Sequence, residues 1–524
     1  MNRSLTIALL GWTPGWEILL EWIGVPWRPV VNLNELTKEN FAVAITNRHL
    51  WRDEVESVEG FVREGGGVLD IGSFLHRIRP EEICRGWLTS VFPDQADPLF
   101  SQIPLLDLDG RGISTRHGWI ERGLLGYSPL GSGRVASLGI DPGAMMENHI
   151  PRTKRFPGID GRHPAERVAR LSKGEVGLLV ERILASLFAE GGLPMIRKRS
   201  FPEDAENIFC FRVDSDYGKR EQIDALYDVA HSTSTPMTWF IHTEGHTGWL
   251  SRFAEFENQE IALHCARHRT FPDKERNRTN IREARRALQE AGMEVKGYAA
   301  PNGIWHHNLA EVIDEEGFAY STEFTLACDA FPFHPILPLH RRVNNHFYRT
   351  LQVPIHPVSV GNLARVGIPD ERMVDYYRGV IDRKIQTHQS IIFYHHPTHE
   401  RWDVVEGIIE SGRRKGVRFM SFGEYANWWQ LRERAQIEGS VEGDQLFLRS
   451  REREKEVHVD ILFPDGTTGQ IQNDGQHGMT DISRRSPHEF SSSQIPQEKI
   501  DHLRNFSFTV ARRALRDYLI RIRR

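Results

Sequence analysis

The sequence predicts an α/β protein built from more than one domain. Its 524 residues exceed what one ordinary hydrophobic core contains. Short apolar runs without alternation recur along the chain, and segments with helical periodicity separate them, which is typical of parallel sheets covered by helices. The pattern changes twice along the chain. We therefore expect domains at 1–192, 205–433 and 437–524.

The first region, residues 1–192, alternates between strands and helices. Its apolar runs predict strands at Leu5–Leu10, Phe41–Ile45, Val68–Ile71 and Val135–Ile140. Helices are expected at Trp16–Ile23, Asp53–Glu64 and Val176–Ala189. The stretch 150–170 is rich in Arg, Pro and Gly and predicts a surface loop. Together these elements favour a flavodoxin-like parallel sheet.

Two segments of this region resemble a class I glutamine amidotransferase-like domain. They are the helix that leads into Gly65–Gly72 and the stretch Gly131–Asp141. The nucleophile of that family is a cysteine on a tight strand-to-helix turn, and neither segment contains one. Cys84 lies in a helix-like context without flanking glycines, which favours a packed thiol. We expect an amidotransferase-like sheet without amidotransferase chemistry.

The middle region predicts a distorted (β/α) barrel. A helix is expected at Asn280–Ala291, where the apolar residues share one face. Helical segments fit between most of the apolar runs, and this repeated alternation is typical of an open or distorted barrel. The predicted strands are Ile208–Val213, Met237–Ile241, Glu260–His264, Val295–Ala299, Leu351–Ile355, Ser390–Tyr394 and Val417–Met420.

The last region is a small β-rich segment that ends in a helix. Gln445–Leu448 and Val457–Leu462 alternate as half-exposed strands do, and a Pro-Asp-Gly turn joins the second to Thr468–Gln472 in a hairpin. The basic stretch Ala511–Arg524 predicts a terminal helix with one apolar side. That helix could contact anionic lipid or dock on the protein's own surface.

Composition excludes several classes of protein. The net charge is -5 and the isoelectric point is near 6.6, so the overall charge does not attract the chain to nucleic acid or anionic membranes. Its four cysteines form no CxxC pair, which favours a reducing compartment. No apolar run approaches the ~18 residues of a membrane span. We expect a soluble cytoplasmic protein without an integral membrane segment; the sequence indicates no oligomeric state.

Two polar clusters follow predicted strands of the middle region. Asp214 and Asp216 come after one apolar run, and His264 and His268 stand at the end of another. Two imidazoles and one carboxylate form a compact divalent-metal site that leaves positions open for water and substrate. A second carboxylate two residues away could act as a base. The clusters indicate a hydrolytic metal centre.

With these clusters in place, the stretch Asn207–Trp429 resembles a polysaccharide deacetylase (NodB-like) domain of carbohydrate esterase family 4. The resemblance implies that Asp214 is the general base and Asp216 a metal ligand. It implies that His264 and His268 complete the ligand set. The expected cofactor is a divalent cation, zinc first, with cobalt and nickel as alternatives.

The family's third motif is altered in this chain. The segment Gly297–Gly303 keeps the family's proline at Pro301, but Ala299 stands where an arginine normally orients the base. Asn302 replaces an aromatic residue. Arg267 or another basic side chain would have to replace the missing arginine. We expect Pro301 and Asn302 to contact substrate, and Trp305 either to form a sugar-stacking wall or to pack in the core.

The family's last motif is a strand that ends in a histidine. Ile391–Pro397 matches it, and the resemblance implies that His396, directly before the proline, protonates the leaving amine. His395 is the alternative. An imidazole with a pKa near its reference value of ~6.5 suits this step. His356 follows another predicted strand and either lines the same pocket or lies outside it.

The resulting hypothesis is a metal-dependent hydrolase that removes an N-acyl group, acetyl above all, from an amino sugar or glycan precursor. One alternative is an amidase that acts on a non-sugar amide, since the altered third motif leaves room for other substrates. Another is a binding protein whose degenerate deacetylase domain recognises glycan without turnover. The full set of aspartates and histidines favours an enzyme.

Overall fold

The computed structural model divides the chain into two compact units. Unit 1 comprises 1–147, 175–203 and 430–494, and unit 2 comprises 148–174, 204–429 and 495–524. The described residues are 2–71, 74–78, 83–115, 119–121, 124–450, 456–486 and 500–515 without 506, 509 and 513. Most of the predicted terminal helix Ala511–Arg524 lies outside them. The boundaries expected near 192, 205 and 437 concern independently folding domains and stay predictions.

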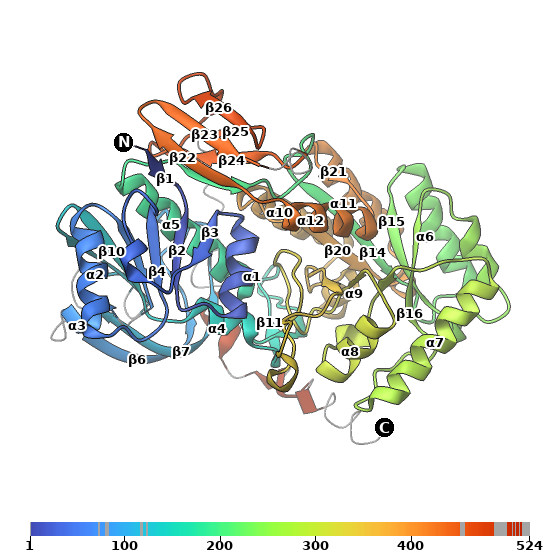
Figure 1. Cartoon of the computed structure of the whole chain (residues 1–524). Coiled ribbons are helices and arrows are strands. Elements are labelled where there is room, and N and C mark those ends of the chain that lie inside the picture. Colours follow the sequence, from blue (N-terminus) through green and yellow to red (C-terminus); the bar gives the residue numbers. More distant parts are fainter. Residues whose placement is uncertain are drawn as a thin grey trace. The chain divides into compact units, whose positions relative to one another are not determined.

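Unit 1 contains the parallel sheet expected near the N-terminus. The strand order is β3 (Trp27–Pro29), β2 (Ile7–Leu10), β4 (Val43–Thr46), β5 (Gly67–Asp70), β10 (Gly133–Leu138), β9 (Leu125–Leu130) and β8 (Trp119–Glu121). The first five are mutually parallel, and β9 and β8 run antiparallel to their neighbours. The helices of this part are α1 (Pro14–Ile23), α2 (Arg52–Arg63), α3 (Phe74–Ile78), α4 (Pro142–Glu147) and α5 (Lys173–Glu190) (Figure 1).

Local signals set the ends of helix α1. The Thr13 side chain accepts a hydrogen bond from the backbone N–H of Trp16, and Pro14 occupies the first turn, where its missing N–H costs nothing. Gly24 ends the helix at φ 81°, a conformation that disfavours residues with a Cβ. The helix therefore begins two residues before the expected Trp16.

The C-terminal β-rich region pairs with strands from earlier in unit 1. One sheet has the order β1 (Arg3–Ser4), β22 (Glu438–Glu442), β23 (Gln445–Arg449) and β26 (Gly475–Gly478). The other has the order β13 (Met195–Lys198), β24 (Val459–Leu462), β25 (Thr468–Ile471) and β27 (Arg484–Arg485). Strands β24 and β25 form the expected antiparallel hairpin.

Two sequence expectations outside the main sheets are corrected. Cys84 lies in strand β6 (Ile83–Val91), which pairs with β7 (Leu106–Thr115), and not in a helix. The stretch 150–170 is not an irregular loop, because β11 (Pro151–Arg155) and β12 (Ala165–Ala169) form an antiparallel pair. Pro and Gly are poor strand formers by propensity, and pairing within unit 2 overrides that preference here.

Unit 2 is built on a curled parallel sheet. Its order is β19 (Leu351–Gln352), β18 (Tyr320–Ser321), β17 (Gly297–Tyr298), β16 (Glu260–Cys265), β15 (Met237–His242), β14 (Ile208–Asp214) and β20 (Ile391–His395), with β21 (Arg418–Phe419) paired to β14. The His356 N–H donates to the Ile392 carbonyl at 2.8 Å, so the segment after β19 reaches back to β20. The sheet is therefore a distorted half-barrel, as the sequence predicts.

Helices follow most strands of this sheet. They are α6 (Arg220–Ser232), α7 (Lys274–Glu290), α8 (His307–Glu315), α9 (Val360–Arg365), α10 (Asp370–Gln386), α11 (Trp402–Arg414) and α12 (Phe422–Arg434) (Figure 1). Helix α7 begins six residues before the expected Asn280, because the Asp273 side chain caps it by accepting from the Arg276 N–H at 2.8 Å. Among the described helices, none is both long and apolar enough to cross a bilayer.

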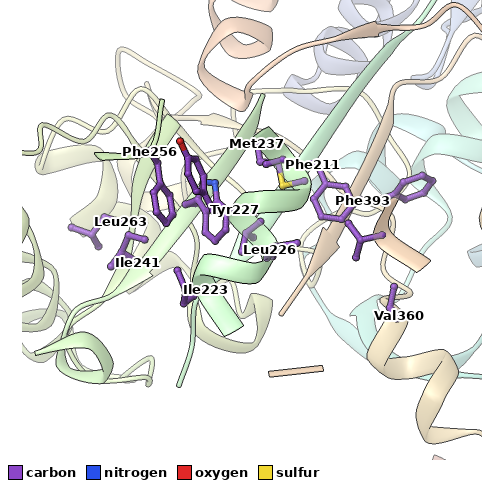
Figure 2. Close-up of a cluster of buried hydrophobic side chains, with 14 of the residues drawn as sticks. Phe211, Ile223, Leu226, Tyr227, Met237, Ile241, Phe256, Leu263, Val360 and Phe393 are labelled. Atoms are coloured by element: carbon purple, nitrogen blue, oxygen red, sulfur yellow. The ribbon is translucent and has the colours of Figure 1, made fainter. Parts of the chain in front are cut away.

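The two faces of the sheet carry different side chains. Alternate residues of a strand point to opposite faces. Phe209, Phe211 and Val213 of β14 join one large apolar cluster with residues of α6 and β15. Figure 2 shows part of this cluster. Arg212 and Asp214, which alternate with these residues, therefore point to the opposite face.

Candidate metal centre and its surroundings

The predicted functional residues gather at the carboxyl ends of three strands. Asp214 is the last residue of β14 and Asp216 lies two residues beyond it, His264 lies near the end of β16, and His396 follows β20. Strand β14 lies between β15 and β20, and β16 is the next neighbour of β15. Because parallel strands end at the same edge, side chains distant in sequence meet there.

Asp216, His264 and His268 form a cluster with the spacing of metal ligands. One potential ligand atom from each lies within 4.8 Å of the other two. Nε2 of His264 and Nε2 of His268 lie 3.3 Å and 3.0 Å from Oδ1 of Asp216. Ligands of a tetrahedral zinc ion with bonds of about 2.0–2.1 Å stand roughly 3.3 Å apart. The spacing therefore fits a small divalent cation.

Two atoms of this cluster are buried without an ordinary hydrogen bond. Among the described residues, neither Oδ1 of Asp216 nor Nε2 of His264 has a partner of good geometry. Buried polar atoms are normally satisfied, so each such atom requires an explanation. Two lone-pair atoms that face each other at 3.3 Å repel unless a proton or a cation lies between them. The donor set fits the predicted cation.

The ring of His264 is oriented by a backbone carbonyl. Its Nδ1 lies 2.6 Å from the Ala299 oxygen, which can only accept, so Nδ1 carries the proton. Nε2 is then the lone-pair atom, and it is the atom that faces Asp216. Histidine ligands commonly have such a partner on the second ring nitrogen, which fixes both tautomer and orientation.

Asp216 adopts a backbone conformation that is uncommon for a residue with a side chain. Its φ is 39°, in the left-handed region. Nδ1 of His242 donates to the Asp216 carbonyl at 2.7 Å, which holds the turn. Gly245 lies against the same turn, and a Cβ there would stand 2.6 Å from the Asp216 carbonyl oxygen. Backbone strain of this kind clusters at functional sites.

The neighbouring imidazoles favour the ionised form of Asp216. Burial raises its pKa, but His396, His264 and His268 outweigh burial and hold the pKa well below its usual value. Asp216 is therefore a negatively charged candidate ligand at neutral pH.

Asp214 forms a two-bond ion pair with Arg212. Nε and Nη2 of Arg212 donate to the two carboxylate oxygens at 2.6 Å and 2.8 Å. Burial alone would raise the pKa of Asp214, but Arg212, His264 and His396 more than compensate and lower it. Asp214 is therefore a buried carboxylate that stays ionised near the candidate ligands.

The structure separates the two histidines of the last motif. Nε2 of His396 lies 3.8 Å from Asp214 and 3.6 Å from Asp216. His395 is fully buried, and its Nε2 donates to the Glu400 carbonyl at 3.0 Å. Burial, then the neighbouring His396, lowers the pKa of His395 well below its usual value. His396, and not His395, is placed to exchange a proton beside the aspartates.

The predicted substrate contacts lie in different environments. Asn302 is exposed at φ 57°, whereas Pro301 is buried. Trp305 is 6% exposed, and its ring lies 5.8 Å from that of His149 and 4.9 Å from that of His307. This burial agrees with the packing interpretation of Trp305. The substrate roles of all three residues stay predictions.

His356 belongs to a buried hydrogen-bond network of its own. Its Nδ1 lies 3.0 Å from Asp329, and its Nε2 lies 3.0 Å from the Tyr376 hydroxyl. Nζ of Lys384 pairs with the same Asp329 at 2.7 Å. Both ring nitrogens are therefore engaged away from the candidate metal ligands, and the network ties the β19 end of the sheet to α10.

Three nearby residues were not expected from the sequence. They are Arg212, His242 and Tyr217. The ring of Tyr217 lies 4.7 Å from that of His242 and 5.6 Å from that of His268. Arg212 could have been found, because a charge inside an apolar strand, two positions before an aspartate, points to the same face. No comparable pattern marks His242 or Tyr217.

Replacing buried His246 with phenylalanine is expected to reduce the acid sensitivity of unfolding. Burial lowers the pKa of His246 to about 4, against ~6.5 when unfolded. Between those values the unfolded chain binds a proton that the folded chain does not, so stability falls as pH falls. The wild type should lose about 2 kcal/mol more than His246→Phe between pH 7.5 and pH 5.

The measurement is urea unfolding at both pH values, with a chelator present so that metal binding does not contribute. A phenyl ring preserves packing against Trp249 and Phe253, whose rings lie 4.6 Å and 5.3 Å from the imidazole. The control is the variant His231→Phe, in which the same substitution is made at an exposed histidine. An identical pH dependence of stability in wild type and His246→Phe would contradict the lowered pKa of His246.

The chain has weak structural likenesses to carbohydrate esterases. A Mycobacterium smegmatis protein assigned to the polysaccharide deacetylases is 16% identical, with a TM-score of 0.38, over 44% of this chain and 93% of that one. A CE4 family pseudoenzyme from Bacillus anthracis is 14% identical, with a TM-score of 0.30, over 43% and 66%. A family 4 acetyl xylan esterase from Clostridium thermocellum, in complex with a cobalt ion, is 12% identical, with a TM-score of 0.28, over 42% and 91%.

No protein-family model matches the sequence, and no curated protein matches it. The three TM-scores all lie below 0.5, so these likenesses assign no function to the chain. None of these likenesses concerns an amidotransferase, and the amidotransferase-like character of residues 1–192 stays a prediction.

Proposed function

We propose that unit 2 is a metal-dependent hydrolase of carbohydrate esterase family 4, which removes an N-acyl group, acetyl in the first instance, from an amino sugar or glycan precursor. One observation carries the reaction type. At one edge of the sheet, three candidate ligand atoms within 4.8 Å of one another meet an ionised carboxylate and an imidazole. The acyl and sugar identities rest on the sequence motifs.

Each side chain has a separate task in this reaction. Asp216, His264 and His268 would hold a divalent cation, which polarises an acyl carbonyl and increases the acidity of water. Asp214 accepts a proton from the attacking water, because it is ionised and lies 3.8 Å from Nε2 of His396, which also neighbours Asp216. The water oxygen bonds to the acyl carbon, the C–N bond breaks, and His396 protonates the departing nitrogen. The products are a carboxylic acid and a free amine.

The metal content of the purified protein tests this proposal. We expect close to one divalent ion per chain in the wild type, and its loss in His264→Ala, because His264 supplies one of the three candidate ligand atoms. His231→Ala, at an exposed histidine of the same unit, should retain the ion. Mass spectrometry of identically prepared samples measures it. A wild type that takes up neither zinc, cobalt nor nickel excludes the hydrolase.

The substrate class is tested on the metal-loaded wild type. Acetate release from N-acetylated amino sugars or their oligomers supports the proposed substrate. Release from acetylated non-sugar amines alone identifies an amidase. Bound metal without release from either class, together with calorimetric binding of an N-acetylated oligosaccharide, identifies a glycan-binding protein.

A further inference from the structure

We infer that Arg212 is a positioning residue: it fixes the Asp214 carboxylate and so takes over the role of the arginine that is missing at Ala299. The inference rests on the proposed function and adds to it a residue that acts through Asp214 and does not itself touch the substrate. Arg212 belongs to β14, whereas Ala299 directly follows β17, which lies three places away in the order of the sheet.

The ion pair has the geometry that fixes a carboxylate most firmly. Two parallel N–H···O bonds, 2.6 Å and 2.8 Å long, join Arg212 to the two oxygens of Asp214. A forked pair of this kind sets both the distance and the plane of the carboxylate, whereas a single bond allows rotation. Each oxygen has two lone-pair positions, so one remains free on each for the proton of water.

The guanidinium group is itself immobilised. Its Nη1 donates to the Thr322 carbonyl at 2.7 Å, on the segment that follows β18. Its central carbon lies 5.2 Å from the ring centre of Phe240 and 5.9 Å from that of Tyr394. These two residues are the register partners of Asp214 in β15 and of Arg212 in β20. Arg212 therefore has contacts in several directions and cannot swing away from Asp214.

The other arginine considered for this role is directed elsewhere. Arg267 has a side chain that is 59% exposed, and it pairs with Glu244 and Glu283. Arg212 is fully buried, and its charge is balanced by Asp214. A charge buried to this degree is costly unless it is paired or hydrogen-bonded. The arginine that pairs with Asp214 is therefore Arg212, which belongs to the same strand, β14.

The test is a double-mutant cycle with Arg212→Met, Asp214→Asn and the double variant, together with Arg212→Lys. Lysine keeps the charge but cannot form the forked pair. We expect Arg212→Lys to lower kcat about 10- to 100-fold, with KM and metal content close to wild type. Arg212→Met should add no further loss of kcat in the Asp214→Asn background, because its effect passes through that carboxylate.

Arg267→Met is the matched control and should leave kcat, KM and metal content unchanged. Additive losses in the cycle, or a wild-type kcat in Arg212→Lys, overturn the inference. If Arg212→Met does not fold, Arg212→Lys and the double variant, in which the unpaired buried charge is absent, still decide. A metal-loaded wild type that hydrolyses no N-acyl compound overturns the proposed function, and the inference that rests on it. An active wild type with additive losses in the cycle overturns the inference alone, so the two failures are distinguishable.

Discussion

Replacing Asp214 with asparagine is expected to lower kcat between about 100- and 10,000-fold while the metal content stays unchanged. Asparagine has nearly the same shape and can still accept one hydrogen bond from Arg212, but it cannot take a proton from water. The substitution removes none of the candidate metal ligands, because the three atoms with ligand spacing belong to Asp216, His264 and His268. Steady-state kinetics on the metal-loaded variant measures the effect.

Asp224→Asn provides the control for this prediction. Asp224 is a partly exposed carboxylate of α6 that pairs with Arg252 and Arg220. The same chemical change there should leave kcat within a factor of about two, since surface substitutions rarely matter. If Asp214→Asn keeps wild-type turnover, a different group must act as the base.

Replacing Arg432 with methionine is expected to destabilise unit 1 by about 3–5 kcal/mol. Arg432 is fully buried and donates to four backbone carbonyls. Nε donates to Arg199, Nη1 to Glu21, and Nη2 to Trp22 and Lys198, at 2.7–3.3 Å. Methionine fills a similar volume but leaves these carbonyls without their donor. The free energy of unfolding by urea, followed by tryptophan fluorescence, measures the loss.

Arg434→Met is the matched control for this prediction. Arg434 stands two residues further along α12 and is exposed. Its replacement should change the unfolding free energy by no more than about 0.5 kcal/mol. Equal stability of Arg432→Met and wild type would show that water or other donors satisfy the four carbonyls after the substitution.

Most of the fold of unit 2 could be predicted because its strands are uninterrupted apolar runs. The expected Ile208–Val213 and Met237–Ile241 correspond to β14 and β15 to within one residue. Strand β18 is different: it contains only Tyr320 and Ser321, and nothing in so short a segment has a period. Such a strand is specified by its neighbours β17 and β19, which the local sequence does not reveal.

The site was predictable where its residues follow strands and unpredictable where contacts cross the sheet. Asp216, His264 and His268 meet because parallel strands end together. The pairing of Arg212 with Asp214 follows from strand alternation, but the partner of His356 does not. Asp329 lies on a segment without regular structure, and only the folded chain brings it within 3.0 Å of the imidazole.

Strand β1 has a consequence for the order of events during synthesis. Arg3 and Ser4 pair with Val441 and Ser440 of β22. At a translation rate of roughly 5–20 residues per second, the first residues wait on the order of tens of seconds for their partner to leave the ribosome. The sheet β1-β22-β23-β26 of unit 1 therefore cannot form completely until nearly all of unit 2 has been synthesised. We expect the sheet of unit 2 to acquire protease resistance first on the nascent chain.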